Sequence, residues 1–308
     1  FPSALVFGAG YLANLGAIPA LVGRGDTVIA DRLVHASLID GIVLSRAKLQ
    51  RFRHNDTAHL EQLLGAAQRT RRAGEKLLVI TESVFSMDGD LAPLAAIANL
   101  AERFEALLMV DEAHAFGVFG PAGDGRVVAE ELTSGVNVVS GTLSKSFGSY
   151  GGFVLSSSAV TRLLTNKART FIFNTALPVP CVRAAQQSLR LLQSDPSLGC
   201  ELLKRADFFR TALRSAGIDV GESGSQIVPV VIGNSNAASS VSHALREHGI
   251  LTPAIRPPTV PYGTSRLRFS ITLQHSVAEL EYVAATLGEL LCKQIGKSSQ
   301  GKGESIPN

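Results

Sequence analysis

The chain has 308 residues, of which 45% are hydrophobic and 18% are charged, so it has enough apolar side chains for a globular core. Its net charge of +3 is too small to predict nucleic-acid binding. No apolar run reaches the roughly 18 residues of a membrane-spanning helix, so no membrane span is expected.

The first half of the chain alternates short apolar runs with longer amphipathic segments. The runs are not interrupted by polar residues at every second position, which is typical of strands buried on both faces. We predict strands at Ser3–Phe7, Thr27–Ala30, Leu77–Thr81, Leu107–Val110 and Val136–Ser140, and helices at Ala58–Ala73 and Leu91–Ala106. This βαβ alternation predicts an α/β fold, with a mostly parallel sheet covered by helices, in a large domain at residues 1–175.

The pattern changes after Pro178 and Pro180, where strands and helices alternate less regularly. We predict helices at Pro180–Ser194, Leu198–Ala216, Ala237–His248 and Val277–Cys292, strands at Gln226–Ile232 and Arg266–Thr272, and an extended segment at Thr252–Pro261. These elements predict a smaller α+β C-terminal domain at residues 176–295. Residues 296–308 are polar and rich in Gly, Ser and Lys, and we predict a disordered tail there.

Polar residues follow three successive strands of the predicted sheet. Glu82 follows the first of these strands, Asp111 and His114 follow the second, and Lys145 follows the third in a loop of Ser, Thr and Gly. Ligands of open α/β sheets bind beyond the carboxyl ends of the strands. A P-loop is excluded because the sequence has no G-x-x-x-x-G-K-[ST]. Lysine also forms Schiff bases with carbonyl cofactors such as pyridoxal 5'-phosphate (PLP).

PLP requires a carboxylate for its pyridine nitrogen and donors for its phosphate. Asp111 suits the first role, and backbone N–H groups at a helix start together with hydroxyl groups suit the second. The candidates for the phosphate are Gly10, Tyr11, Thr142 and Ser144. Taken alone, Asp111 would be an ordinary turn or cap residue and Lys145 a solvated loop lysine. Their combination at ordered strand ends favours a PLP site.

A second motif supports a different class of function. Gly8–Ala13 matches G-x-G-x-x-A after a predicted strand, and Asp31 lies about 20 residues further on. This is the dinucleotide fingerprint, and an NAD-dependent oxidoreductase is therefore the alternative. The same glycine turn serves a single phosphate equally well, and Arg32 is a candidate ion-pair partner for Asp31.

Specific strings, spread from Phe7 to about Leu291, resemble the α-oxoamine synthases of the fold-type-I PLP-dependent transferases. The strings are Phe7-Gly-Ala-Gly-Tyr-Leu-Ala-Asn14, Asp31-Arg-Leu-Val-His-Ala-Ser37, Thr81-Glu-Ser-Val-Phe-Ser-Met-Asp-Gly89, Val110-Asp-Glu-Ala-His114, Gly141-Thr-Leu-Ser-Lys145 and Arg256-Pro-Pro-Thr-Val-Pro261. The resemblance implies a PLP cofactor, a homodimer and a decarboxylating condensation of an amino acid with an acyl thioester carried by CoA or a carrier protein.

The resemblance also implies a role for each matching residue. Lys145 is similar to the Schiff-base lysine, Asp111 to the partner of the pyridine nitrogen and His35 to the residue that stacks on the PLP ring. Arg268 resembles the clamp of the amino-acid carboxylate. The other expected site residues are Ser86 and His114 at the phenolic oxygen, Gly10, Tyr11 and Thr142 at the phosphate, Glu82 near the substrate, and Thr259 at the phosphate of the neighbouring subunit.

The segment Ala254–Pro261 most resembles the 8-amino-7-oxononanoate synthases of biotin synthesis, which use L-alanine and a pimeloyl thioester. Relatives that use glycine or serine, and a non-catalytic paralogue, are the alternatives within the resemblance. No metal is expected. Three cysteines, none of them in a CxxC pair, favour a reducing, cytoplasmic setting over a disulfide framework.

Overall fold

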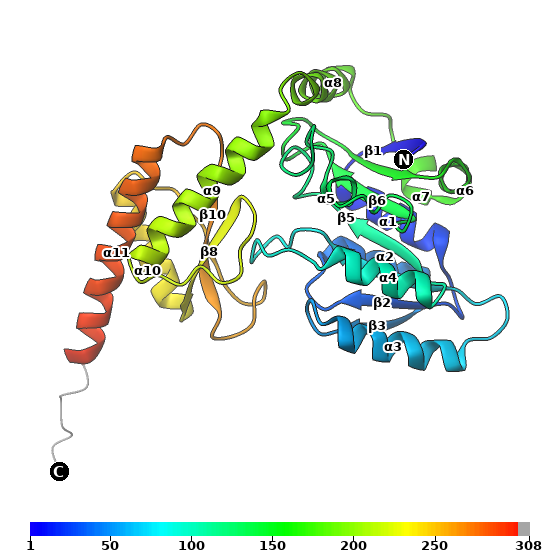
Figure 1. Ribbon diagram of the computed structural model, residues 1–308, viewed down its shortest axis with the longest axis horizontal. Coiled ribbons are helices and arrows are strands. Elements are labelled where there is room, and N and C mark those ends of the chain that lie inside the picture. Colours follow the sequence, from blue (N-terminus) through cyan, green and yellow to red (C-terminus); the bar gives the residue numbers. More distant parts are fainter. Residues whose placement is uncertain (301–308) are drawn as a thin grey trace, which may run out of the picture. The chain divides into compact units, whose positions relative to one another are not determined.

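The computed structural model describes residues 1–300, with the burial of side chains described to residue 292 (Figure 1). It divides into two compact units. The first contains residues 1–85 and 91–200, and the second contains residues 86–90 and the chain from residue 201 onward. No helix in the described part is long and apolar enough to cross a membrane. The cysteines Cys181, Cys200 and Cys292 are free thiols.

The first unit is built on a seven-stranded sheet in the order β1-β7-β6-β5-β4-β2-β3. Its strands are β1 (Ser3–Phe7), β2 (Thr27–Asp31), β3 (Lys48–Phe52), β4 (Leu77–Glu82), β5 (Leu107–Asp111), β6 (Val138–Thr142) and β7 (Gly152–Ser156). The five strands β2 to β6 pair in parallel, whereas β7 and β1 pair antiparallel at one edge. The predicted α/β class with a mostly parallel sheet is confirmed.

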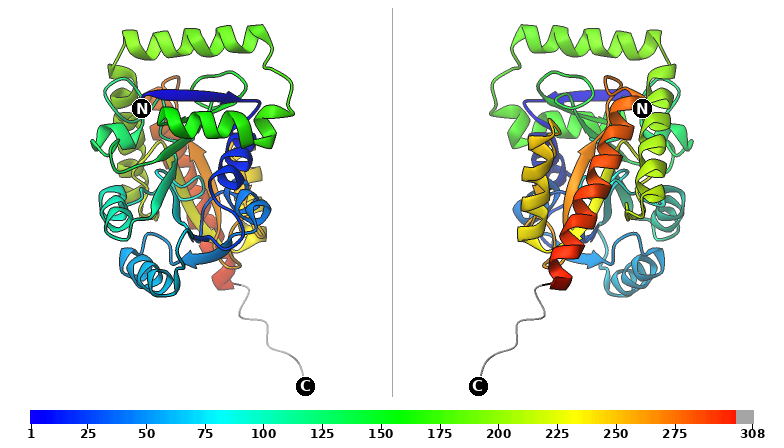
Figure 2. Two further views of the ribbon diagram at one scale, coloured as in Figure 1. Left: turned by 90° about the vertical axis from the view of Figure 1, so that its right-hand side faces the viewer. Right: turned by 90° about the vertical axis from the view of Figure 1, so that its left-hand side faces the viewer.

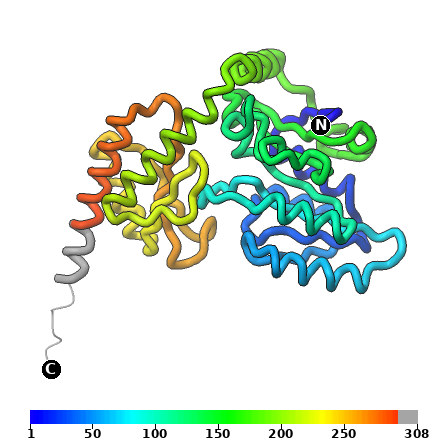
Figure 3. The backbone as a smooth tube through the Cα atoms, viewed as in Figure 1, coloured from blue at the N-terminus to red at the C-terminus, as the bar shows by residue number. Residues whose placement is uncertain are grey.

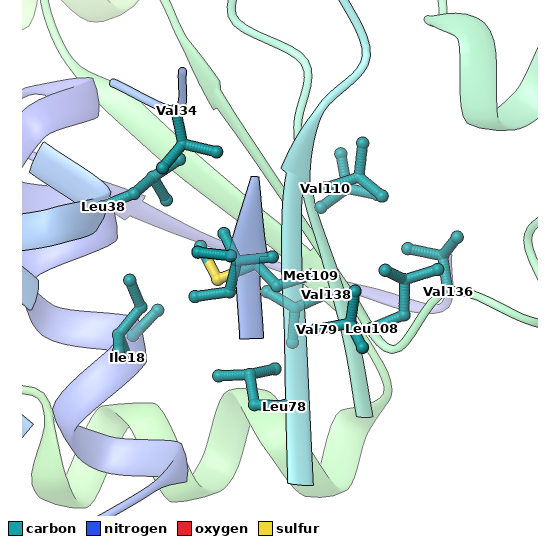
Figure 4. Close-up of a cluster of buried hydrophobic side chains, with 14 of the residues drawn as sticks. Ile18, Val34, Leu38, Leu78, Val79, Leu108, Met109, Val110, Val136 and Val138 are labelled. Atoms are coloured by element: carbon teal, nitrogen blue, oxygen red, sulfur yellow. The ribbon is translucent and has the colours of Figure 1, made fainter. Parts of the chain in front are cut away.

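Helices cover this sheet because parallel strands require crossover connections. They are α1 (Gly10–Leu21), α2 (Ala36–Ser45), α3 (Thr57–Thr70), α4 (Leu94–Arg103), α5 (Arg126–Ala129), α6 (Ser158–Lys167), α7 (Arg169–Ile172) and α8 (Val179–Ser194). Figure 4 shows Ile18 of α1 and Leu38 of α2 on the same side of the sheet as Leu78 of β4 and Met109 of β5. All four side chains are fully buried, so this face of the sheet forms a continuous core.

Several predicted boundaries move by a few residues, each for a local reason. Strand β6 begins two residues later than predicted, so Thr142 ends the strand instead of following it. Helix α4 begins at Leu94 because Pro93 precedes it and Leu91 forms a β-bridge with Val84. Strands β3 and β7 and helix α2 were not predicted. The pattern of β3, KLQRF, is too polar to signal a buried strand.

The first unit extends to Cys200, past the boundary predicted at residue 175. Helix α8 is attached to it through main-chain oxygens: Ser188 Oγ donates to Phe147 O at 2.8 Å, and Ser149 Oγ donates to Cys181 O at 2.6 Å. Figures 1 and 2 show α8 beyond the edge strand β1, and Ala185 is the residue of α8 that is buried.

The second unit contains a three-stranded antiparallel sheet in the order β8-β10-β9. Its strands are β8 (Ile227–Gly233), β9 (Ala254–Ile255) and β10 (Ser265–Ser270), and its helices are α10 (Ser235–Glu247) and α11 (Val277–Gln300). Helix α9 (Ser197–Ser215) enters it at residue 201. Figure 3 follows this unit from α9 (yellow-green) to α11 (red). The predicted tail starts inside α11, which continues to Gln300, and residues 301–308 lie outside the described residues.

Candidate active site

The carboxyl ends of the central parallel strands meet at one edge of the first unit's sheet. Glu82 pairs in register with Asp111, and Asp111 pairs with Ser140 on β6. A cavity of about 240 Å³ lies there. It is lined by Ala9, Gly10, Tyr11, Asn14, His35, Ser37, Glu82, Asp111, Ala113, His114, Gly141, Thr142, Ser144 and Lys145. The structure therefore brings together most of the site residues that the sequence predicts.

Lys145 lies in the hairpin loop that joins β6 to β7. Main-chain bonds close this loop: Leu143 N donates to Gly151 O at 2.9 Å, Ser149 N to Leu143 O at 2.8 Å and Gly148 N to Lys145 O at 3.0 Å. The Lys145 Nζ atom lies 2.8 Å from His114 Nε2. The amine is therefore held at the cavity wall by a fixed loop and a neighbouring imidazole.

Asp111 ends β5 and is 7% exposed. Its Oδ1 accepts from Ala113 N at 2.9 Å, and its Oδ2 accepts from Asn14 Nδ2 at 2.7 Å. These two donors hold both oxygens of the carboxylate in place, since an ionised carboxylate is an acceptor only. Each oxygen keeps a further lone pair for a ligand.

Asn14 and Ser37 are site residues that the sequence did not single out. Asn14 Nδ2 also donates to Ser37 Oγ at 3.0 Å, and Ser37 Oγ lies 2.8 Å from His35 Nδ1. Both residues were inside the family-like strings, but Asn14 and Asp111 are 97 positions apart. The only local signal was helical spacing, because Asn14 is one turn after Gly10 on α1.

Glu82 ends β4 and is 3% exposed. Its Oε1 accepts from the backbone N–H of His35 at 2.5 Å. Burial raises the pKa of Glu82 well above its usual value, the negative charge of Asp111 raises it further, and the bond from His35 opposes both effects. Glu82 is therefore a carboxyl group that favours its protonated form inside the site.

The predicted phosphate ligands lie together at the start of α1 and the end of β6. Thr142 Oγ1 and Ser144 Oγ are 2.7 Å apart, and Ser144 N donates to Thr142 Oγ1 at 3.2 Å. A Cβ on Gly10 would lie 3.0 Å from Thr142 Cβ, so glycine permits this close approach. The first turn of α1 carries no acidic residue, and its N-terminus favours an anion.

The hydroxyl of Tyr11, another predicted phosphate ligand, donates to Asp40, which does not line the cavity. This bond is the main reason why the pKa of Tyr11 is raised above its usual value. The backbone N–H of Tyr11 in the first turn of α1 remains its candidate contact with an anion.

Glu112 anchors the turn that carries Asp111 and His114. Its Oε1 accepts from Arg126 N at 2.8 Å and Val127 N at 3.1 Å. Glu112 is 1% exposed, and burial raises its pKa to about 7 against the lowering effect of these bonds. It faces the protein interior, whereas the preceding residue, Asp111, lines the cavity.

Three predicted site residues belong to the second unit, namely Ser86, Thr259 and Arg268. Arg268 Nε donates to Ser86 O at 2.5 Å, and its Nη1 donates to Ser270 Oγ at 2.8 Å. Thr259 N donates to Arg256 O at 3.0 Å. Their roles toward a cofactor or substrate stay predictions.

Asp31 does not serve as a ribose ligand. It is fully buried, and it accepts from Leu33 N at 2.8 Å and Asn55 N at 2.9 Å, while His54 Nδ1 lies 3.0 Å from its Oδ1. Arg32, the ion-pair partner suggested by sequence, is not among these groups. Groups of the protein itself thus bind the carboxylate of the acidic residue in the dinucleotide fingerprint. This removes the main support for the NAD alternative.

Comparison with known proteins gives the family. Residues 2–287 match the model of the aminotransferase class I and II family. The chain is 45% identical over 290 residues to a Geobacter sulfurreducens protein named 8-amino-7-oxononanoate synthase, covering 94% of this chain and 73% of that protein. The chain belongs to the PLP-dependent α-oxoamine synthases.

Two solved structures of α-oxoamine synthases resemble this chain over most of its length. A lysine-to-alanine variant of serine palmitoyltransferase from S. paucimobilis, with a bound PLP–myriocin aldimine, is 35% identical, with a TM-score of 0.89, covering 94% of this chain and 73% of that one. The 8-amino-7-oxononanoate synthase from Francisella tularensis is 28% identical, with a TM-score of 0.81, covering 96% and 84%. The fold-type-I architecture predicted from sequence is confirmed.

The cavity of this α-oxoamine synthase fits PLP. It offers an amine on Lys145, a doubly supported carboxylate on Asp111, and hydroxyl groups beside a helix N-terminus. Asn14 Oδ1 is a buried oxygen without a hydrogen-bond partner among the described residues, so the polar groups of the site are not saturated by the chain. No cluster of metal ligands occurs among the described residues.

Proposed function

We propose that this α-oxoamine synthase joins L-alanine to a pimeloyl thioester, with loss of carbon dioxide and release of the thiol. The observation that carries the proposal is the placement of Lys145 Nζ, 2.8 Å from His114 Nε2, in the same cavity as Asp111. Two features support these substrates: the 45% identity to a protein named 8-amino-7-oxononanoate synthase, and the string Ala254–Pro261.

PLP, when bound, supplies a carbonyl carbon for the lysine amine and a ring that accepts electrons from the amino-acid Cα. Lys145 Nζ would hold the cofactor covalently, and its free amine would take the Cα proton of the amino acid. His114 Nε2 holds this amine in place. Asp111 keeps the ring nitrogen protonated, because Asn14 and Ala113 stabilise its negative charge.

Three further residues of the cavity bind and orient the ligands in this proposal. His35 stacks on the ring of the cofactor. Glu82, whose raised pKa favours the protonated carboxyl, donates a hydrogen bond to a substrate oxygen. Its other oxygen holds the backbone of His35, so it also fixes the entry of α2. Gly10, Tyr11, Thr142 and Ser144 hold the phosphate.

The proposal also gives roles to three residues of the second unit. Arg268 binds the amino-acid carboxylate: its Nε and Nη1 are directed to Ser86 O and Ser270 Oγ, and its Nη2 has no bond to a described residue. Ser86 contributes to the phenolic oxygen. Thr259 reaches the phosphate of a second copy of the chain, so we propose a homodimer with shared sites.

A second candidate is condensation of serine with a longer acyl thioester. It is favoured by the similarity to serine palmitoyltransferase, whose TM-score of 0.89 exceeds the 0.81 of the Francisella 8-amino-7-oxononanoate synthase. Alanine, serine and glycine differ by one methyl or hydroxyl group, which changes selectivity by only about 1–3 kcal/mol. The structural similarity alone therefore does not decide between these amino acids.

The proposal is tested by titrating the holoenzyme with L-alanine, L-serine and glycine while its visible spectrum is recorded, followed by thiol release from pimeloyl-CoA and palmitoyl-CoA. We expect L-alanine to change the spectrum at the lowest concentration, and pimeloyl-CoA to release thiol only when L-alanine is present. Release that depends on serine and palmitoyl-CoA would establish the second candidate. No release with any pair would support a non-catalytic paralogue.

A further inference from the structure

A chain of hydrogen bonds, buried from Ser37 onward, connects His35 to Asp111 through two residues without an assigned role. Its links are His35 Nδ1 to Ser37 Oγ at 2.8 Å, Ser37 Oγ to Asn14 Nδ2 at 3.0 Å, and Asn14 Nδ2 to Asp111 Oδ2 at 2.7 Å. Asn14 is 2% exposed and Ser37 is 1% exposed, so water does not compete for the two bonds that Asn14 makes.

The direction of each bond follows from the donors and acceptors present. Asp111 as a carboxylate only accepts, so the Asn14 amide must present its NH₂ group to it; the flipped amide would place oxygen against oxygen. The second N–H of Asn14 then donates to Ser37 Oγ. Having accepted this bond, the Ser37 hydroxyl has its own proton available for His35 Nδ1.

The backbone supplies an independent constraint on the same ring nitrogen. His35 is the N-cap of α2, and Ser37 N donates to His35 Nδ1 at 3.2 Å. A protonated Nδ1 would point its hydrogen at this N–H group. Nδ1 is therefore the unprotonated nitrogen, and the proton of the neutral ring lies on Nε2, the nitrogen that is remote from Ser37.

The charges around His35 are compatible with a neutral ring. Partial withdrawal of the ring from water is the largest effect and lowers the pKa of His35. Asp111 and Asp40 raise this pKa and Lys145 lowers it, while the Tyr11 ring lies edge-on at 6.3 Å. Oε1 of the Glu82 carboxyl group accepts from the His35 backbone N–H.

We call the chain of hydrogen bonds from His35 through Ser37 and Asn14 to Asp111 the relay. The packing of two helices holds it in place. Asn14 lies on α1 and Ser37 lies on α2, and the two helices approach closely at Gly41. A Cβ at Gly41 would lie 3.1 Å from Asn14 O and 2.9 Å from Ile18 Cδ1. The short distance between α1 and α2 that the relay requires thus depends on a residue without a side chain.

We propose that Asn14 and Ser37 are positioning residues that orient the Asp111 carboxylate and hold His35 as the neutral Nε2–H tautomer. The Nε2 nitrogen of His35 then carries the N–H donor of the ring. A role of this N–H donor in catalysis rests on the proposed function, whereas the tautomer of His35 follows from hydrogen bonds within the protein.

The tautomer is read from ¹⁵N NMR of the holoenzyme with ¹⁵N-labelled histidine, with the His35 signals assigned by their loss in His35→Gln. We expect a protonated Nε2 and an unprotonated Nδ1 at neutral pH. A protonated Nδ1, or an imidazolium with both nitrogens protonated, would overturn the proposal. This result does not depend on the substrates, so it separates failure of the relay from failure of the proposed function.

Substitutions test whether the relay holds the carboxylate as well as the ring. We expect Asn14→Ala to raise the PLP dissociation constant about tenfold, since a hydrogen bond to a charged group is lost. Ser37→Ala should shift His35 toward a mixture of tautomers. The double variant should raise the PLP dissociation constant by less than the product of the factors measured for the two single variants, because both residues belong to one chain of bonds.

Ser45→Ala is the matched control for these substitutions. It also removes a buried hydroxyl from α2, but one that donates to Ile42 O at 2.6 Å within the helix. The control should leave the tautomer and the PLP affinity unchanged. If Ser37→Ala and Asn14→Ala behave like Ser45→Ala in both measurements, the relay does not exist.

Discussion

The carboxyl edge of the seven-stranded sheet and the three-stranded sheet of the second unit both bury polar side chains, but they use them differently. At the large sheet, Asp111 keeps lone pairs, and Asn14 has an oxygen without a partner among the described residues, in the cavity that Lys145 also lines. On β10, Arg266 pairs with Asp88, and Arg268 bonds to Ser86 O and Ser270 Oγ. The first arrangement leaves polar groups for a ligand, whereas the second mainly fixes the chain segment Ser86–Asp90.

The largest effect is expected at Lys145. Lys145→Ala should reduce α-oxoamine synthesis at least about 1000-fold, because both the covalent attachment and the base are lost. Steady-state thiol release measures the effect. Lys167→Ala, which removes an exposed lysine from the last turn of α6, is the control and should retain full activity. Equal activity in the two variants would show that Lys145 does not react.

Near the carboxyl edge of the large sheet, the carboxyl group of Glu112 should make the stability of the protein depend on pH. Its folded-state pKa of about 7 lies above the ordinary value of 4.5, so the folded chain binds the proton more tightly than the unfolded chain. Stability from this group is therefore fully present below about pH 4.5 and falls as the pH rises to about 7. The loss is about 3 kcal/mol, from 1.36 kcal/mol per pKa unit.

Glu112→Gln keeps the acceptor for Arg126 N and Val127 N but cannot ionise. We expect this variant to gain stability over the natural chain at about pH 8 and not at about pH 4, in urea or thermal unfolding. A difference that is the same at both pH values would show that Glu112 does not titrate in this window.

A substitution of Arg266 tests whether the polar groups of the three-stranded sheet serve to fix the segment Ser86–Asp90. Its guanidinium is 7% exposed and pairs with Asp88, which is 34% exposed. Arg266→Ala should lower the free energy of unfolding by about 2 kcal/mol, between the values for exposed and buried pairs. Covalent PLP content should be unchanged. Loss of PLP with normal stability would mean that Arg266 acts at the cofactor and not on the fold.

The sequence predicted the parts of the molecule that depend on local pattern. Buried strands such as β4 and β5 are uninterrupted apolar runs, so Glu82 and Asp111 could be placed at their ends. Asn14 and Ser37 could not be assigned, because their roles arise from packing between α1, α2 and β5. Strand β3 was missed because its position at the edge of the sheet leaves Lys48 and Arg51 exposed, so the strand is not an apolar run.

The boundary between the two units shows a similar limit of local pattern. Helix α8 was assigned to the smaller domain because the sequence changes character at Pro178 and Pro180. Its contacts with Phe147 and Ser149 join it to the first unit instead. Conversely, Ser86 and its neighbours to Asp90 belong to the second unit through Arg266 and Arg268, which no pattern near residue 86 indicates.

The covalent attachment of PLP to Lys145 is tested most directly by reducing the holoenzyme with borohydride, digesting it and locating the modified lysine by mass spectrometry. We expect the phosphopyridoxyl group on the peptide that contains Lys145, and on no peptide of the Lys145→Ala variant. Modification of a different lysine in the natural chain, or retention of a reducible bond in the variant, would contradict the assignment of Lys145.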